Sequence, residues 1–113
     1  VFDCWYGPAV LTDPPATRVK RLENDLVKML RVAEPQVHPN ENIVDVNYQV
    51  FITDKATGEI EEVFETHRMR YLFVPELEYL LAEAGFKLAA MHEWMSENLP
   101  SLSSWGTCFV AKP

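Results

Sequence analysis

Apolar and polar side chains alternate most regularly in residues 43–53, which are therefore the clearest predicted strand. Its apolar members share one parity: Val44, Val46, Tyr48, Val50 and Ile52. Because successive side chains of a strand point to opposite faces, Asp45 and the other polar residues are predicted to form the second face. Residues 54–58 end in Gly58 and predict a hairpin loop. Residues 59–72 are the predicted return strand, and their irregular phase indicates a bulge or a twisted, partly exposed strand.

Five further segments are predicted to be strands: residues 1–6, 17–23, 26–37, 86–95 and 105–112. The first ends at Gly7 and Pro8, and the prolines that follow leave room for at most one helical turn before the next strand. Asn24 and Asp25 predict a turn between the second and third. Pro35 lies inside the third, and because proline cannot donate a ladder hydrogen bond we expect it at an edge or a bulge.

The one main helix is predicted over residues 74–84. Pro75 suits the first helical turn, and Glu76 complements the positive end of the helix dipole. An apolar stripe recurs at helical spacing: Leu77, Leu80, Leu81 and Ala84. Gly85 then suits the left-handed position that ends a helix. The helix therefore follows most of the β-structure and precedes two final strands.

Composition limits the class of protein. The chain has 113 residues, of which 48% are hydrophobic and 24% charged, as in a globular rather than a disordered protein. This length suffices for a single domain without disulfides or metal. The formal net charge of −7 argues against binding to nucleic acid or to an anionic membrane, because both require a basic surface. No apolar run approaches the roughly 20 residues that a membrane-spanning helix needs.

Cys4 and Cys108 are the only cysteines. One disulfide between them is an open alternative, but nothing in the sequence is typical of a secreted protein, so two buried thiols and a cytoplasmic location are favoured. No spacing of histidine and cysteine predicts a metal site. The chain begins at Val1 inside a predicted strand and without a signal peptide, and we therefore expect a piece of a longer protein.

Four segments carry a more specific signal. They are residues 2–8 (FDCWYGP), residues 57–60 (TGEI), residues 70–86 with their leucine pattern and Ala-Gly-Phe ending, and residues 108–112 (CFVAK). In this order they resemble the second half of a class I S-adenosylmethionine-dependent methyltransferase, from its fifth strand to its final helix and hairpin. The greatest similarity is to the sugar and small-molecule methyltransferases, which insert an antiparallel β layer after strand five.

The resemblance implies a fold. It predicts an α+β structure with a largely antiparallel sheet and one main helix, the C-terminal part of a Rossmann-like methyltransferase. Residues 17–72 would be the antiparallel excursion, and residues 74–113 the helix with the terminal hairpin. The last strand would lie antiparallel between residues 1–6 and 86–95, with Cys4 and Cys108 on neighbouring strands. The far edge of residues 1–6 would be bare, and because unpaired strand edges favour association we expect a homodimer through it.

The same resemblance implies a reaction and a missing cofactor site. The intact enzyme would transfer a methyl group from S-adenosylmethionine to a small polar acceptor, such as a sugar or sugar nucleotide. The family's Gly-rich cofactor loop is absent, because the four glycines are scattered as Gly7, Gly58, Gly85 and Gly106. We therefore expect this chain alone not to bind S-adenosylmethionine and to be inactive.

Two groups of side chains are candidates for substrate binding. Trp5 and Tyr6 end the first strand, at the edge where α/β folds place ligands, although both could be core residues. His38, Asn40 and Asn42 form a polar segment between two long strands, which can carry function or serve only as a turn.

Basic side chains near the end of the return strand form a third group. Arg68 and Arg70 share a strand face and could grip a phosphate or carboxylate. The alternative is that they are solvated charges that pair with Glu61, Glu62 or Glu65 across the hairpin. His67 is the predicted general base for an acceptor hydroxyl or ammonium, whereas His92 is expected to be a surface residue.

Two rival functions use no methyl transfer. One is a stand-alone α+β binding module that uses its β layer for ligand or protein contacts. The other is a small α+β protein similar to the cystatins or to nuclear transport factors, in which a curved sheet encloses an apolar pocket. The position of the helix disfavours the second, because it should precede most of the strands.

Overall fold

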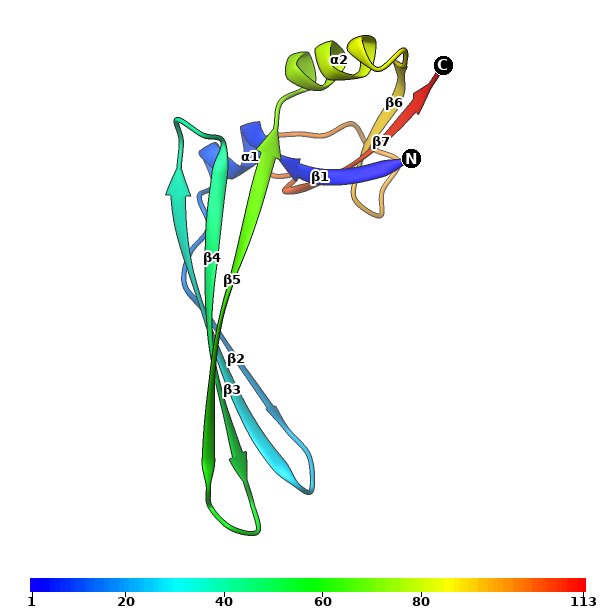
Figure 1. Ribbon diagram of the computed structural model, residues 1–113. Coiled ribbons are helices and arrows are strands. Elements are labelled where there is room, and N and C mark those ends of the chain that lie inside the picture. Colours follow the sequence, from blue (N-terminus) through cyan, green and yellow to red (C-terminus); the bar gives the residue numbers. More distant parts are fainter. The chain divides into compact units, whose positions relative to one another are not determined.

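The computed structural model describes residues 1–113, which form seven strands and two helices (Figure 1). In chain order they are β1 (Phe2–Tyr6), α1 (Gly7–Thr12), β2 (Arg18–Glu23), β3 (Val27–His38), β4 (Ile43–Asp54), β5 (Ile60–Leu72), α2 (Val74–Glu83), β6 (Lys87–Glu93) and β7 (Gly106–Lys112). The hydrogen-bonded strand order is β2-β3-β4-β5-β1-β7-β6, and β1 pairs with β5 in parallel. The predicted α+β fold, with a mostly antiparallel sheet and one main helix, is confirmed.

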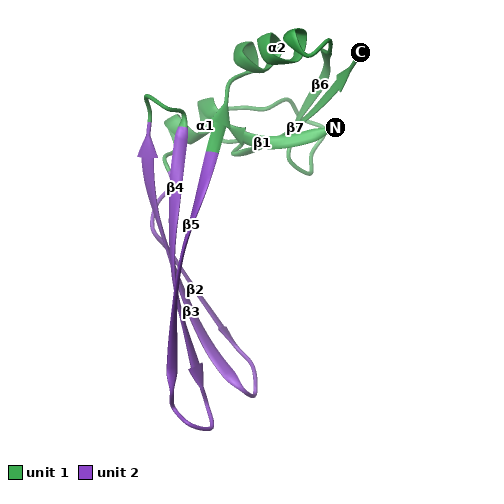
Figure 2. Cartoon of the chain, in the orientation of Figure 1, with its two compact units in different colours: residues 1–14, 39–42, 70–113 green, residues 15–38, 43–69 purple.

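The chain divides into two compact units (Figure 2). Unit 1 contains residues 1–14, 39–42 and 70–113, and unit 2 contains residues 15–38 and 43–69. Each unit is described below by itself.

Unit 2 consists of long hairpins. Strand β3 pairs antiparallel with β2 on one side and with β4 on the other. Asn24 begins the first turn, and its Oδ1 accepts the backbone N–H groups of Leu26 and Val27. In the second turn Gly58 has a φ of 75°, which glycine adopts without steric cost, as the sequence predicts. Pro35 lies beyond Ala33, the last β3 residue that pairs with β2, so its predicted edge position is confirmed.

Burial follows the predicted alternation in the first part of β4, whereas residues 48–53 are all half-buried. Val44 is fully buried and Val46 nearly so, whereas Asn47 between Val46 and Tyr48 is exposed. Strand β5 behaves differently, because every residue from position 60 to position 68 is exposed. The irregular phase of the return strand therefore belongs to a largely exposed strand, which is one of the two predicted alternatives.

In unit 1, strand β7 lies antiparallel between β1 and β6, as the family resemblance implies. The far edge of β1 is not bare, however, and this part of the prediction is wrong. Trp5 and Tyr6 pair in parallel with Tyr71 and Leu72, because β5 continues to the start of α2 and reaches the carboxyl end of β1. Only the amino-terminal part of β1 lacks a strand on that side.

Helix α1 and the two cysteines of unit 1 differ from what the sequence favours or leaves open. Helix α1 has six residues rather than a single turn, because Pro8 fits the start of a helix, where its missing N–H is not needed. Cys4 lies opposite Thr107 and Cys108 lies opposite Asp3, so this one-residue offset directs the two thiols to opposite faces of the sheet. Both cysteines are free, and the disulfide alternative is excluded. Neither helix has the length and apolarity to cross a lipid bilayer.

Candidate functional site

The most connected polar cluster of unit 2 centres on Asp45 of β4. Its Oδ2 lies 3.0 Å from Nε2 of His38 on β3 and accepts a hydrogen bond of 3.0 Å from Arg68 on β5. Its Oδ1 accepts a second hydrogen bond of 2.9 Å from Nε of Arg68. The side chain of Asp45 is only 13% exposed. One carboxylate therefore joins three strands and brings together two of the predicted substrate-binding residues.

The charges around Asp45 keep its carboxylate ionised. The hydrogen bonds from Arg68 lower the pKa of Asp45 most, and the charge of Arg68 and the contact with His38 lower it further. Partial burial acts in the opposite direction but does not prevail. Both Asp45 oxygens are thus occupied, so the chemical capacity of the cluster lies on the His38 ring.

This geometry suits proton transfer by His38. A carboxylate that accepts the N–H of one ring nitrogen fixes the tautomer and leaves the other nitrogen as a proton acceptor. The side chain of His38 is 29% exposed and therefore reachable from solvent. His38 can consequently serve as a base toward a hydroxyl or ammonium group. The sequence prediction gave His38 a binding role and did not single out Asp45, although strand alternation placed Asp45 on the polar face.

His67, the predicted general base, lies on the other face of β5 from Arg68. Its ring packs edge-on against Tyr48 at a centroid distance of 4.9 Å, and its Nε2 lies 3.4 Å from a carboxylate oxygen of Glu65. The His67 side chain is half exposed. The contact of His38 with Asp45 is thus shorter than that of His67 with Glu65, and the side chain of Asp45 is more buried than that of Glu65.

Unit 1 holds the other predicted site residues, and two of them, Trp5 and Tyr6, end strand β1. The rings of Trp5 and Trp105 lie 5.2 Å apart between centroids, and Nε1 of Trp105 donates a hydrogen bond of 3.1 Å to the carbonyl oxygen of Asp13. Tyr6 is partly exposed, and its backbone N–H donates to the carbonyl oxygen of Trp105. The aromatic pair predicted from the sequence therefore gains a third ring, from the segment before β7.

The remaining predicted residues of unit 1 make structural contacts. Arg70 forms an ion pair with Glu76 in the first turn of α2. Asn40 is exposed, whereas Asn42 has a φ of 55° and its carbonyl oxygen accepts the backbone N–H of Tyr71. Arg68 and Arg70 thus do pair with carboxylates, and the pairs formed are with Asp45 and Glu76, which the solvated-charge alternative did not name.

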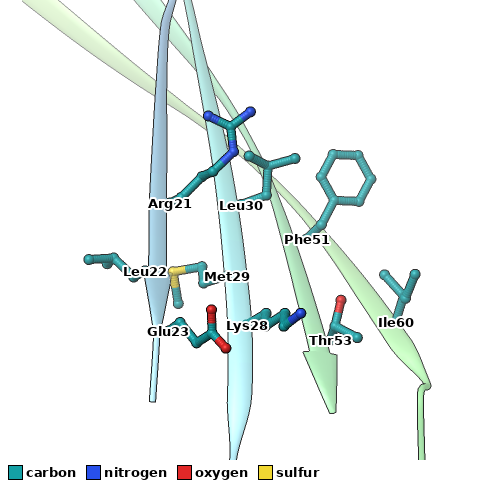
Figure 3. Close-up of a pocket in the computed structure, with 9 residues that line it drawn as sticks. All are labelled: Arg21, Leu22, Glu23, Lys28, Met29, Leu30, Phe51, Thr53 and Ile60. Atoms are coloured by element: carbon teal, nitrogen blue, oxygen red, sulfur yellow. The ribbon is translucent and has the colours of Figure 1, made fainter. Parts of the chain in front are cut away.

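Unit 2 also has an open hollow with a volume of about 670 Å³ near the hairpin ends (Figure 3). Charged side chains line one part of it: Arg21 and Glu23 from β2 and Lys28 from β3. Apolar side chains line much of the remainder, among them Leu30, Phe51 and Ile60. The strand register places this hollow on the same sheet face as Asp45. Such a lining suits a ligand with both polar and apolar parts.

The glycines do not form a cofactor cradle, because the fold uses each of them otherwise. A Cβ at Gly7 would lie 2.7 Å from the ring of Phe73, and one at Gly106 would lie 3.2 Å from Cβ of Trp94. Gly58 and Gly85 adopt positive φ in a hairpin turn and at a helix end. The described residues therefore do not fit S-adenosylmethionine at a glycine-rich turn. No group of three or more His, Cys, Asp or Glu residues lies close enough to hold a metal ion.

No protein-family model and no curated protein matches the sequence. Solved structures match the fold. An S-adenosylmethionine-dependent methyltransferase from Clostridium acetobutylicum superposes with a TM-score of 0.72 at 15% identity, over 98% of this chain and 42% of that one. CalS10, an amino pentose methyltransferase from Micromonospora echinaspora, superposes with a TM-score of 0.61 at 17% identity, over 84% of this chain and 35% of its own.

A third structure is KedS8, a sugar N-methyltransferase from Streptoalloteichus, with a TM-score of 0.61 at 8% identity. It is matched over 85% of this chain and 35% of its own length. This chain thus spans less than half of each of these structures, and the low identities establish the fold alone. The resemblance stated from the sequence is confirmed at that level. The chain has the fold of the C-terminal portion of an S-adenosylmethionine-dependent methyltransferase.

Proposed function

We propose that the chain is the acceptor-side part of an S-adenosylmethionine-dependent methyltransferase that acts on a small polar molecule, such as an amino sugar or a sugar nucleotide. The observation that carries this proposal is the superposition of 98% of the chain on part of one such enzyme. Two further similar structures are described as an amino pentose methyltransferase and a sugar N-methyltransferase, which supports the acceptor class. In this proposal residues outside the 113 bind the methyl donor.

The Asp45 cluster supplies the acceptor chemistry in this proposal. Methyl transfer requires that donor and acceptor are held in line, and a base increases the rate when the acceptor carries a proton. His38, oriented by Asp45, removes that proton through its second ring nitrogen. Arg68 holds the Asp45 carboxylate in place and keeps it charged. The S-adenosylmethionine supplies the electrophilic methyl group.

The test uses the complete protein encoded by the gene that contains this chain. Methyl transfer from labelled S-adenosylmethionine is measured against a panel of amino sugars, sugar hydroxyls and their nucleotide-linked forms. We expect turnover on part of the panel, and a decrease in kcat of about 100-fold or more for His38→Ala. The matched variant His67→Ala should lower kcat much less. A complete protein that binds no S-adenosylmethionine would overturn the proposal.

A second candidate is the stand-alone binding module, which the amphipathic hollow of unit 2 favours. Calorimetry on the 113-residue chain separates the two functions. In the methyltransferase proposal, S-adenosylmethionine gives no heat with the chain alone but binds the complete protein. If the complete protein also gives no heat, while a ligand binds the chain and Phe51→Ala abolishes that binding, the chain is a binding module.

A further inference from the structure

Three basic side chains lie together on the face of unit 2 that does not carry Asp45. Lys20 of β2 lies directly opposite Arg31 of β3, and Arg18 lies opposite Ala33, two positions further along β3. Because directly opposite residues project from the same face of a sheet, the three cations share one face. Their side chains start within about 8 Å of one another and can therefore reach one common ligand.

No acidic side chain of β2, β3 or β4 neutralises this basic cluster. Strand parity and register place three of the four acids of these strands on the other face: Glu23, Glu34 and Asp45. The fourth, Asp54, lies opposite Val27, which is about 13 Å along β3 from Arg31. Its Oδ1 accepts two backbone N–H groups of the hairpin turn. Like charges thus face each other without an anion, an arrangement that costs stability.

The guanidinium of Arg31 is held in place but has no acceptor. Its central carbon lies 5.2 Å from the centroid of the Tyr48 ring, a favourable cation–π distance. Its Nε is buried without a hydrogen-bond partner, and Arg31 forms no ion pair. His67 contacts the same ring, and Glu65 lies 3.4 Å from His67 rather than pairing with Arg31. The donors of a positioned arginine therefore remain unused.

We propose that this face of unit 2 binds a phosphate group through Arg18, Lys20 and Arg31. The planar fork of a guanidinium matches two phosphate oxygens, and a lysine adds a point charge. A phosphate carries between one and two negative charges at pH 7, whereas a carboxylate carries only one. Because the Tyr48 ring already orients Arg31, less side-chain freedom is lost when the anion binds.

The phosphate site is separate from the Asp45 cluster, because the sheet lies between them. A small acceptor at His38 does not reach it, so the inference does not depend on methyl transfer. The sequence placed a phosphate grip at Arg68 and Arg70 instead, but both of these arginines pair with carboxylates. The cations without such partners are those of β2 and β3.

The test titrates inorganic phosphate into the 113-residue chain by calorimetry at pH 7 and low salt. We expect saturable binding with a Kd below about 1 mM. Lys20→Gln and Arg31→Gln should each weaken it roughly 10-fold, and Arg31→Lys less than Arg31→Gln. Circular dichroism establishes that each variant is folded. Lys20 is exposed, so Lys20→Gln keeps the test valid even if Arg31→Gln does not fold.

The matched controls remove one positive charge from the same two strands but from the opposite face. Arg21→Gln on β2 and Lys28→Gln on β3 should each change the Kd by less than about twofold. Acetate, with a single charge, should bind roughly 10-fold more weakly than phosphate. Methyl phosphate separates two sources of the ligand. Binding as tight as that of phosphate assigns the site to phosphate esters, and much weaker binding assigns it to free phosphate.

Four results would overturn the proposal. The first is the absence of saturable binding up to about 10 mM phosphate, and the second is a folded Lys20→Gln variant that binds as tightly as wild type. The third is acetate binding as tight as that of phosphate. The fourth is an equal loss of binding in Arg21→Gln or Lys28→Gln, because the anion would then lie on the face that carries Asp45.

Discussion

The guanidinium of Arg68 forms a two-pronged hydrogen bond with the carboxylate of Asp45, from Nε to Oδ1 at 2.9 Å and from Nη2 to Oδ2 at 3.0 Å. This geometry matches the planar fork of arginine to the two oxygens of a carboxylate. Because Oδ2 also contacts His38, the pair links the conformation of β5 to the orientation of a histidine on β3. The position of His38 therefore depends on a residue 30 positions further along the chain.

Asp45→Asn should destabilise the protein in a pH-dependent manner. The pKa of Asp45 is lower in the folded chain than the value of about 3.9 expected when it is unfolded. Its stabilising contribution is therefore complete above the unfolded pKa and is lost as the pH falls through the folded pKa. We expect a lower urea midpoint for Asp45→Asn than for wild type at pH 7, and a smaller difference at about pH 3.

Two further variants make this measurement specific. Arg68→Lys keeps the positive charge but loses the two-pronged geometry, so its urea midpoint should lie between those of wild type and Asp45→Asn. Asp25→Asn, in an exposed turn, should have little effect. A difference between Asp45→Asn and wild type that is the same at pH 3 as at pH 7 would contradict the role assigned to the charged carboxylate.

The sequence predicts most elements of the fold because their signals are local. The alternation in β4, the turns at Asn24 and Gly58, and the proline and glycine that flank α2 each act within a few residues. The pairing of β1 with the end of β5 escaped prediction because it joins residues 66 positions apart, Trp5 and Tyr71, and no local pattern specifies that contact.

The Asp45 cluster was only partly predictable for a similar reason. Strand parity places Asp45 on the polar face, but the registers of two strand pairs decide that His38 and Arg68 reach it. The glutamates expected to pair with the arginines lie nearby in the sequence. In the structure, the strand register instead brings Asp45 to Arg68, and the start of α2 brings Glu76 to Arg70. The sequence alone does not reveal these two pairs.

The thiol of Cys4 should be unreactive near neutral pH. Burial, and to a lesser extent the charges of Asp3 and Glu76, raises its pKa to about 11. At pH 8 the reactive thiolate is therefore roughly 100-fold rarer than for a thiol of pKa about 9. In a Cys108→Ser variant, alkylation of Cys4 should be slow at pH 8 and still accelerate above pH 10. Fast labelling at pH 8 that requires no unfolding would show that this thiol is not shielded.

Gly7→Ala should destabilise unit 1 because of one aromatic ring. A Cβ on Gly7 would lie 2.7 to 2.8 Å from three ring carbons of Phe73, closer than real contacts allow. The expected loss is about 1–3 kcal/mol in the free energy of unfolding by urea. Phe73→Leu should reduce the additional cost of Gly7→Ala, as a double-mutant cycle measures.

Gly58→Ala provides the control for this loss. Gly58 has a positive φ, but no atom lies within 4 Å of a Cβ added there. The Gly58→Ala variant should therefore lose only the conformational cost of about 1–2 kcal/mol in the free energy of unfolding. If Phe73→Leu leaves the cost of Gly7→Ala unchanged, the ring is not its cause.

Two buried hydroxyls in unit 1 have no hydrogen-bond partner within the chain, and we expect them to lower its stability. The side chains of Tyr71 and Thr107 are fully buried, and neither hydroxyl has a hydrogen-bond partner within the chain. A buried hydroxyl without a partner loses its bonds to water and gains none, at a cost of about 1–3 kcal/mol. Tyr71→Phe and Thr107→Val remove that cost with almost no change of shape. We therefore expect each variant to have an equal or higher free energy of unfolding than wild type.

Tyr79→Phe is the control, because the ring of Tyr79 is largely exposed and its hydroxyl is hydrated in both states, so stability should stay within about 0.5 kcal/mol. A buried water that bonds to either hydroxyl would make its removal destabilising by about 1 kcal/mol. A loss of stability in Tyr71→Phe would therefore contradict the prediction and assign an internal water to that site. Thr107→Val tests the other hydroxyl by the same reasoning.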